Sequence, residues 1–249
     1  MFERSFDIPY FGLAPNGLMK PVVLLDFFQE IAGMDVVCLG MTVRDLRERG
    51  MTWVLRRYHI RFEQQLTYGQ SFTIKTWYEP YKNLFSQRVF NVFNEQGQRV
   101  CFAWSSWILL DIERMRPLRL DRGTTEAYYR EMVPTGERYD EKIAEVGEAD
   151  HEIRLKSRWH ELDVNGHVNH TVYFNWVQEA VPYELPETHA VSLMEAEFFQ
   201  PVLRSEVRIA TRELPSGAGE RDFIHSVRTD SGGVSQECVK LRMLWKNIQ

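Results

Sequence analysis

Two stretches of this chain, LAPNGLMKPVVLLDFFQEI (residues 13–31) and LDVNGHVNHTVYFNWVQEA (residues 162–180), align without a gap at a separation of 149 residues. Six of the nineteen aligned positions are identical, and most of the others keep their apolar character. Each stretch opens with a polar turn around an Asn-Gly pair and continues with apolar residues at the spacing of an amphipathic helix. The sequence therefore predicts a turn-helix unit that occurs twice, with Thr171 capping the second helix.

A second pair of stretches aligns downstream at a separation of 135 residues. Residues 62–76 fall on residues 197–211, and Gln65 coincides with Gln200. Runs rich in β-branched and aromatic residues, typical of strands, follow in both copies. These runs lie at residues 72–79, 85–95, 99–112, 206–214, 222–230 and 237–246. Each copy is thus predicted to be an α+β unit, an antiparallel sheet wrapped around one long apolar helix.

The segment between the two copies has a different composition. It is rich in charged residues and marked by proline and glycine, as in ERMRPLRLDRG and VPTGERYDEKIAEVGEAD. We expect domains at residues 1–120 and 150–249, joined by a connecting segment at residues 121–149 with a helix near residues 124–133.

Composition narrows the class of protein. The chain has 249 residues, 44% of them hydrophobic, and a formal net charge of −5, which does not favour a nucleic-acid partner. No run approaches the roughly 20 apolar residues of a membrane helix, and the first residues lack the apolar core of a signal peptide. Three well-separated cysteines, at positions 38, 101 and 238, favour reduced thiols. We therefore expect a cytoplasmic protein with no stable membrane insertion; a homodimer is possible.

The two polar turns differ in their ionisable residues. The second has Asp163, Asn165 and His167 where the first has alanine, asparagine and leucine. A carboxylate can activate water or attack a carbonyl, an imidazole can shuttle a proton near neutral pH, and an amide can fix a substrate carbonyl. Because Asp163 and His167 occur in one copy alone, we interpret them as doing something other than shaping the turn. The alternative is that they are ordinary turn residues.

Other chemistries have less support in the sequence. There is no G-x-S-x-G elbow, Gly-rich phosphate loop or H-E-x-x-H motif. His167 and His170 have a spacing seen in metal sites, but no cysteine accompanies them and the neighbouring asparagines are poor zinc ligands. We therefore expect no metal and no cofactor, and we expect His170 to be a surface or capping residue. Glu179 is either a structural carboxylate or a residue that polarises the site.

WHELDVNGHVNHTVYFNWVQEAVP (residues 159–182) resembles the signature of the acyl-acyl carrier protein thioesterases of bacteria and plants. MTWVLRRYHIRF (residues 51–62) and SSWILLDIERMRPLRL (residues 105–120) resemble the first domain of that family. The resemblance implies two tandem hot-dog domains, with the acyl pocket in the first and catalysis in the second. It implies that Asp163, Asn165 and His167 hydrolyse the thioester of fatty acyl-acyl carrier protein and release free fatty acid.

Four further residues are expected to contact the substrate: Asn169, Glu179, Gln200 and Trp53. Trp53 would line the acyl cavity, and Gln200 would orient a water or share a structural role with Gln65. Plant members of the family carry a Glu and a Cys on the strand after the second helix. The nearest counterparts here are Gln200, Pro201 and Val202, which excludes a cysteine nucleophile at that place.

The partner implied by the resemblance is acyl carrier protein, an acidic protein, carrying a fatty acyl chain. Candidate basic contacts are Arg114, Arg116, Arg119 and Arg122, or Arg56, Arg57 and Arg61. Three alternatives stay open: a thioesterase for acyl-coenzyme A, a non-catalytic acyl-binding hot-dog protein, and a dehydratase. The preferred acyl chain length does not follow from the sequence.

Overall fold

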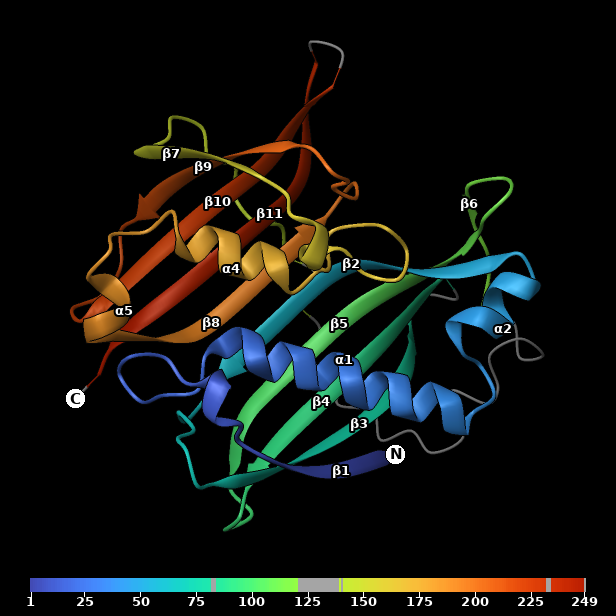
Figure 1. The fold of residues 1–249 in the computed structure, drawn as a ribbon, viewed down its shortest axis with the longest axis horizontal. Helices are drawn as coiled ribbons and strands as arrows, with labels where there is room; N and C mark the ends of the chain where they lie inside the picture. Colours follow the sequence, from blue (N-terminus) through green and yellow to red (C-terminus); the bar gives the residue numbers. More distant parts are fainter. Residues whose placement is uncertain (82–83, 121–138, 140, 232–233, 249) are drawn as a thin grey trace. The chain divides into compact units, whose positions relative to one another are not determined.

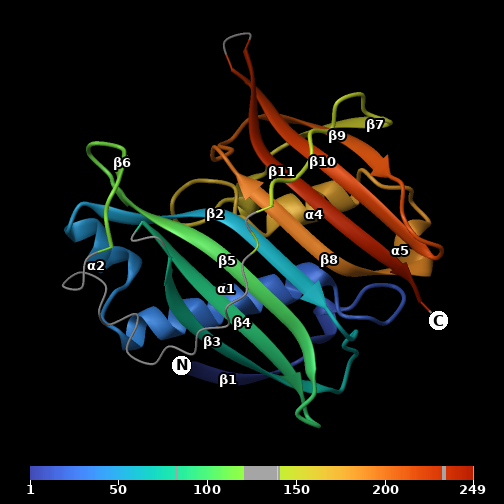
Figure 2. The same ribbon diagram turned by 180° about the vertical axis from the view of Figure 1, so that it is seen from behind.

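The structure, a computed structural model, describes residues 1–81, 84–120, 139, 141–231 and 234–248. The chain divides into two compact units, Met1–Asp140 and Glu141–Gln249, coloured blue to green and yellow to red in Figure 1. In each unit a helix covers one face of an antiparallel sheet, and the strands lie in front of that helix in the view from behind (Figure 2). The helix expected near residues 124–133 lies outside the described residues.

The first unit contains a five-stranded antiparallel sheet. Its strand order is β1-β3-β4-β5-β2, and β6 pairs with β5. The elements are β1 (Phe2–Asp7), η1 (Tyr10–Gly12), α1 (Pro21–Cys38), α2 (Val43–Glu48), β2 (Met51–Phe62), β3 (Ser71–Tyr81), β4 (Phe85–Asn94), β5 (Arg99–Asp111) and β6 (Arg116–Pro117).

Helix α1 forms the core of the first unit with this sheet. It begins with Pro21 at its first position, where the missing N–H has no intrahelical partner to lose. Leu24, Phe28 and Ile31 are almost completely buried. The Phe28 ring stacks on Phe90 of β4, with ring centroids 4.5 Å apart. Apolar residues at helical spacing thus place α1 along the sheet, as the sequence predicts.

A buried ion pair also joins α1 to its sheet. Arg88 Nη2 lies 2.8 Å from Asp35 Oδ2, and Arg88 donates further hydrogen bonds to Thr76 and Tyr78. Burial raises the pKa of Asp35, and the guanidinium of Arg88 opposes that rise. The buried guanidinium of Arg88 is stabilised by these three partners, because an unpaired buried ion is strongly destabilising.

The second unit repeats the plan with the strand order β8-β11-β10-β9-β7. Its elements are β7 (His151–Lys156), η3 (Trp159–Glu161), α4 (Val172–Gln178), α5 (Leu185–Thr188), β8 (His189–Phe198), β9 (Glu206–Leu214), β10 (Glu220–Ser231) and β11 (Val234–Asn247). The six strand runs expected from sequence are confirmed as β3, β4, β5, β9, β10 and β11. Strands β1, β2, β6, β7 and β8 are not among the expected runs; β1 and β7 are edge strands with many exposed charged residues.

The helix of the second unit is short. Helix α4 has 7 residues, whereas α1 has 18. The N–H groups of Glu179 and Ala180 bond the carbonyls of Trp176 and Val177, three residues back, so the helix ends in a tight turn before Pro182. The prediction of a long central helix therefore holds for the first unit and is wrong for the second.

The interior of the second unit contains a buried histidine. His225 on β10 is 0% exposed, and its Nδ1 lies 2.9 Å from Thr211 Oγ1 on β9. Burial lowers the pKa of His225 to about 3, so the ring is neutral at pH 7. Phe90 occupies the corresponding place in the first unit, at the separation of 135 residues that relates β4 to β10.

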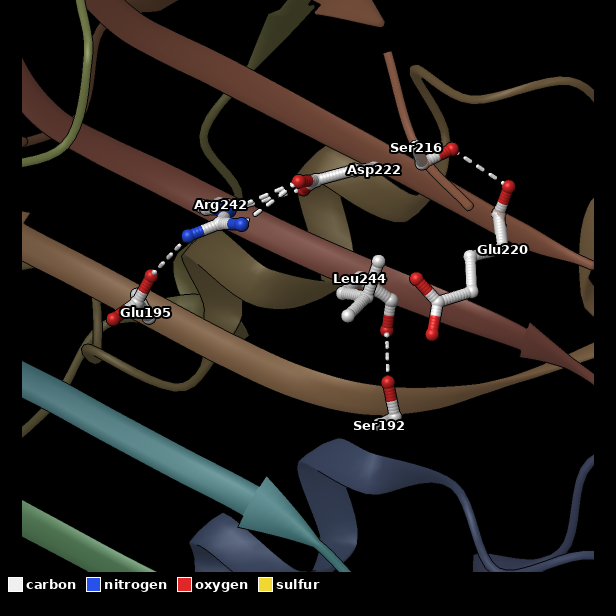
Figure 3. A network of polar contacts seen from close by, with 7 residues as sticks. All are labelled: Ser192, Glu195, Ser216, Glu220, Asp222, Arg242 and Leu244. Carbon is white, nitrogen blue, oxygen red and sulfur yellow. Dashed lines mark hydrogen bonds and ion pairs between the residues drawn. The ribbon is translucent and has the colours of Figure 1, made fainter. Parts of the chain in front are cut away.

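The other face of the second sheet carries charged side chains in register (Figure 3). Arg242 on β11 lies between Asp222 on β10 and Glu195 on β8, with Nη2–Oδ2 and Nη1–Oε2 distances of 2.9 and 3.3 Å. Ile143 and Val146 pack against Ile224 on this same face. The network links three neighbouring strands, which gives these charges a structural explanation.

The structure confirms the first repeat and corrects the second at one place, around Gln200. The bridges Leu13↔Met19 and Leu162↔Val168 fall at equivalent positions, 149 residues apart. After the strands β2 and β8, however, the N–H groups of Gln64 and Gln200 bond equivalent carbonyls, those of Val100 and Cys238. The counterpart of Gln200 is therefore Gln64, one residue away from the predicted Gln65.

Candidate active site

Residues 162–168 form a closed loop before α4. The Asp163 N–H bonds the His167 carbonyl at 2.7 Å, and the Gly166 N–H bonds the Asp163 carbonyl at 3.0 Å. Gly166 has a φ of +76°, in the left-handed region that glycine adopts without strain. The loop in the first unit has the same bonds between Ala14 and Leu18 and between Gly17 and Ala14. Asn-Gly therefore gives both units the same backbone.

The carboxylate of Asp163 lies inside its own loop. Its Oδ1 accepts the N–H groups of Asn165 and His167 at 2.8 and 3.2 Å, and its Oδ2 accepts the Asn165 side-chain amide at 3.1 Å. Asn16 does similar work in the first unit, where its Oδ1 accepts the Leu18 N–H at 3.0 Å. The sequence interpretation gave Asp163 a role other than shaping the turn; these bonds show that its carboxylate also shapes the turn, as the neutral amide of Asn16 does in the first unit.

The three predicted residues Asp163, Asn165 and His167 come together in this one loop. Asn165 is exposed, and Asp163 and His167 are partly buried. The loop thus presents a carboxylate, an amide and an imidazole within one short segment that solvent can reach. Such a set can orient a water, hold a carbonyl and transfer a proton.

The residues that lead into α4 are also polar. The Asn169 side chain accepts the Thr171 N–H at 3.2 Å, whereas the Thr171 side chain makes no capping hydrogen bond. The Asn169 side chain therefore closes the turn that precedes the helix, and Thr171 at the N-cap position contributes no side-chain cap. His170 is partly buried; burial lowers its pKa to about 4, and the charge of Asp163 opposes this shift. The His170 ring is thus neutral at pH 7 and partly buried, whereas a surface or capping residue is expected from the sequence.

Two buried side chains that the sequence reasoning missed also contact this region. Glu161 accepts the Trp176 indole N–H at 3.0 Å, and Tyr173 accepts the Val202 N–H at 3.0 Å. The repeat held the signal for the first of these, because Glu161 aligns with Gly12 just upstream of the aligned stretch. This difference between the two copies could have identified Glu161 as a residue that is specific to the second unit.

The remaining predicted substrate contacts are dispersed. Glu179 is exposed at the C-terminal end of α4, and Gln200 is exposed after β8. Trp53 belongs to the first unit, where it packs against a buried cluster of Met41, Leu46, Tyr78 and Leu109. Among the described residues, no group of three or more His, Cys, Asp or Glu side chains could hold a metal ion.

Some of the expected basic contacts are already paired with acids. Arg114 lies 3.7 Å from Asp111, and Arg61 lies 3.3 Å from Glu63. Arg122 lies outside the described residues. Across the residues that the structure describes, no helix has the length and the hydropathy to cross a membrane.

Comparison with known proteins places these units in a family. The model of the acyl-ACP thioesterase N-terminal domain matches residues 1–128, and that of the C-terminal domain matches residues 144–247. A palmitoyl-acyl carrier protein thioesterase of Cuphea hookeriana is 24% identical over 99% of this chain and 62% of its own length. A dodecanoyl-[acyl-carrier-protein] hydrolase of Umbellularia californica is 23% identical over 99% of this chain and 68% of its own length. The chain thus spans about three fifths to two thirds of these relatives.

Solved structures agree with the fold. A putative oleoyl thioesterase from Lactobacillus plantarum superposes with a TM-score of 0.89 at 20% identity, covering 100% of this chain and 96% of its own. The 12:0-ACP thioesterase from Umbellularia californica gives 0.85 at 24% identity, covering 99% and 97%. These matches confirm the α+β tandem hot-dog fold. With both domain models matched in order along the chain, this protein belongs to the acyl-ACP thioesterase family.

Proposed function

We propose that this protein hydrolyses the thioester of fatty acyl-acyl carrier protein and releases free fatty acid. The observation that carries the proposal is the loop of Asp163, Asn165 and His167 in a chain of this family. The equivalent loop of the first unit has the same backbone but Ala14 and Leu18 in place of the two ionisable residues.

In the proposed mechanism the Asp163 carboxylate orients and activates a water for attack on the thioester carbonyl. The side-chain amide of Asn165 is a hydrogen-bond donor, and in this proposal it would hold the carbonyl oxygen of the thioester. His167 would give a proton to the leaving thiolate. Water adds to the carbonyl carbon, the carbon–sulfur bond breaks, and the products are a carboxylic acid and a thiol.

The other predicted residues have supporting roles in this proposal. Asn169 fixes the end of the loop by accepting the Thr171 N–H, and Glu179 and Gln200 are exposed polar side chains of the same unit. Trp53 would contribute to an acyl pocket in the first unit. The carrier partner is proposed from the family, and a basic surface that attracts it would lose effect at high ionic strength.

The test is hydrolysis of acyl carrier protein thioesters of graded chain length, measured as the release of free thiol. Wild type should turn over, and Asp163→Ala and His167→Ala should each lower kcat by about 100-fold or more with the fold retained by circular dichroism. Near-normal turnover by both variants would refute the site. A clear preference for the coenzyme A thioester would refute the carrier, and binding without hydrolysis at any length would refute the activity.

A further inference from the structure

Glu161 joins the base of the loop to the helix. Its backbone carbonyl accepts the Asn169 N–H at 2.9 Å, just beyond the Leu162↔Val168 bridge that closes the loop. Its side chain, in a residue only 9% exposed, accepts the Arg158 N–H at 2.6 Å and the Trp176 indole N–H at 3.0 Å. The loop therefore cannot move relative to α4 without breaking a buried, charge-assisted hydrogen bond.

Tyr173 makes a second connection on the other side of the loop. The Val202 carbonyl accepts the N–H of Val168, a loop residue, at 2.8 Å. The Val202 N–H donates to the Tyr173 hydroxyl at 3.0 Å, and Tyr173 is 2% exposed. The backbone of Val202 thus binds the loop with its carbonyl and α4 with its N–H.

Neither side-chain connection exists in the first unit. The counterparts of Glu161, Tyr173 and Trp176 are a glycine, a leucine and a phenylalanine, at positions 12, 24 and 27. A Cβ at Gly12 would lie 3.1 Å from a Val23 methyl, so a side chain between turn and helix would be crowded there. The backbone connection is shared, since the Met19 N–H bonds the Leu66 carbonyl at 2.8 Å. The loop folds in both units, and the side-chain connections are added only where Asp163 and His167 occur.

We propose that Glu161 and Tyr173 are positioning residues, which fix the loop of Asp163 and His167 on α4 and on the backbone of Val202 and thereby hold the reacting groups in place. The activity part of this inference rests on the proposed function. The loop has ordinary backbone bonds of its own, so the extra connections serve placement more than folding. Small displacements of reacting groups are costly, since an error of about 1 Å can reduce rate by about 100-fold.

Five variants separate this role from general stabilisation: Glu161→Ala, Glu161→Gln, Trp176→Phe, the double variant Glu161→Ala/Trp176→Phe, and Tyr173→Phe. Glutamine keeps an oxygen for the indole N–H, so E161Q should retain most of the activity that E161A loses. We expect E161A, W176F and Y173F to lower kcat by about 10- to 100-fold, with KM changed by less than about threefold. The double variant should lose little more than E161A alone, because both changes break one interaction.

Trp159→Phe is the matched control, because Trp159 is in the same turn as Glu161 but is 76% exposed. It should leave kcat unchanged. Additive losses in the double variant, or unchanged kcat in folded E161A, W176F and Y173F, would overturn the inference.

A second measurement does not depend on activity. Amide hydrogen exchange of residues 162–168 should be faster in E161A and Y173F than in wild type and W159F, while residues 13–19 stay unchanged. Unchanged exchange of residues 162–168 would overturn the positioning role even if the protein hydrolysed no thioester. If wild type is inactive but exchange changes as expected, the proposed function fails and the positioning role stands.

Discussion

Asp163 accepts two hydrogen bonds from Asn165, one from the backbone N–H at 2.8 Å and one from the side-chain amide at 3.1 Å. The carboxylate thus has one task in the structure and a second in the proposed mechanism. It holds the loop closed, as Asn16 does in the first unit, and in the proposed mechanism it also activates water. A substitution that keeps the first task and removes the second can separate them.

Asp163→Asn is that substitution, since the amide oxygen can still accept the N–H of Asn165. We expect the free energy of unfolding of D163N to lie within about 0.5 kcal/mol of that of wild type. Its kcat for hydrolysis should fall by about 100-fold or more. D163A should lose hydrolysis and also about 1–2 kcal/mol of stability, as for a lost side-chain cap. Urea unfolding and thiol release measure both. Equal stability loss in the two variants would contradict the structural task, and an active D163N would contradict the chemical one.

Gly166 and Gly17 offer a matched pair in the two loops. Both have positive φ, +76° and +81°, and a Cβ at either would meet no atom within 4 Å. Alanine should therefore cost about 1–2 kcal/mol at each position, from backbone strain alone. Only Gly166→Ala should lower kcat, by about tenfold or more, because it shifts the reacting groups. An equal fall of activity in Gly17→Ala would show that the effect is not local to the candidate site.

His225 makes stability depend on pH. Burial lowers its pKa to about 3 from an ordinary value of 6.5, so below pH 6.5 the unfolded chain binds a proton that the folded ring refuses. The stability should fall as the pH drops from about 6.5 towards 3. At pH 4.5 the cost is about 2–3 kcal/mol, from two units of about 1.4 kcal/mol each.

His225→Phe, the residue found at the equivalent position 90, should remove this cost. The gain of H225F over wild type should be larger at pH 4.5 than at pH 7.5 by about 2–3 kcal/mol, measured by urea unfolding. Part of the pH dependence of stability that remains in H225F is expected from His170, whose pKa is lowered to about 4. A difference between H225F and wild type that is the same at both pH values would contradict the assignment.

The ion pair of Asp35 and Arg88 gives a test in the first unit. Asp35→Ala leaves the buried guanidinium without its carboxylate and should cost about 3–5 kcal/mol. The double variant Asp35→Leu/Arg88→Met replaces both charges by apolar groups and should recover most of that loss. Thermal unfolding measures both effects. A double variant no more stable than D35A would contradict this prediction.

Sequence reasoning identified the architecture because the chain contains two copies of one unit, and the positions that agree between the copies report structural requirements. Positions that are apolar in both copies mark the core, and Asn-Gly in both marks a turn that needs a left-handed residue. The same comparison pointed to Asp163 and His167 by their difference from Ala14 and Leu18. The comparison failed where two residue types fill the same structural role, since Asp163 and Asn16 both accept N–H groups in their loops. It also failed at the start of α4, where the Thr171 side chain makes no capping hydrogen bond.

The sequence by itself thus determined the repeat, the α+β class and the loop that holds the candidate site, since these follow from local spacing and turn chemistry. The tertiary structure alone decided that Glu161 bonds Trp176, that Tyr173 bonds Val202, and that burial makes His170 and His225 neutral. Hydrogen bonds of this kind join residues 15 to 29 positions apart. The burial of these two histidines likewise depends on which segments pack around them in three dimensions, and a lone polar residue has no periodic pattern that would predict it.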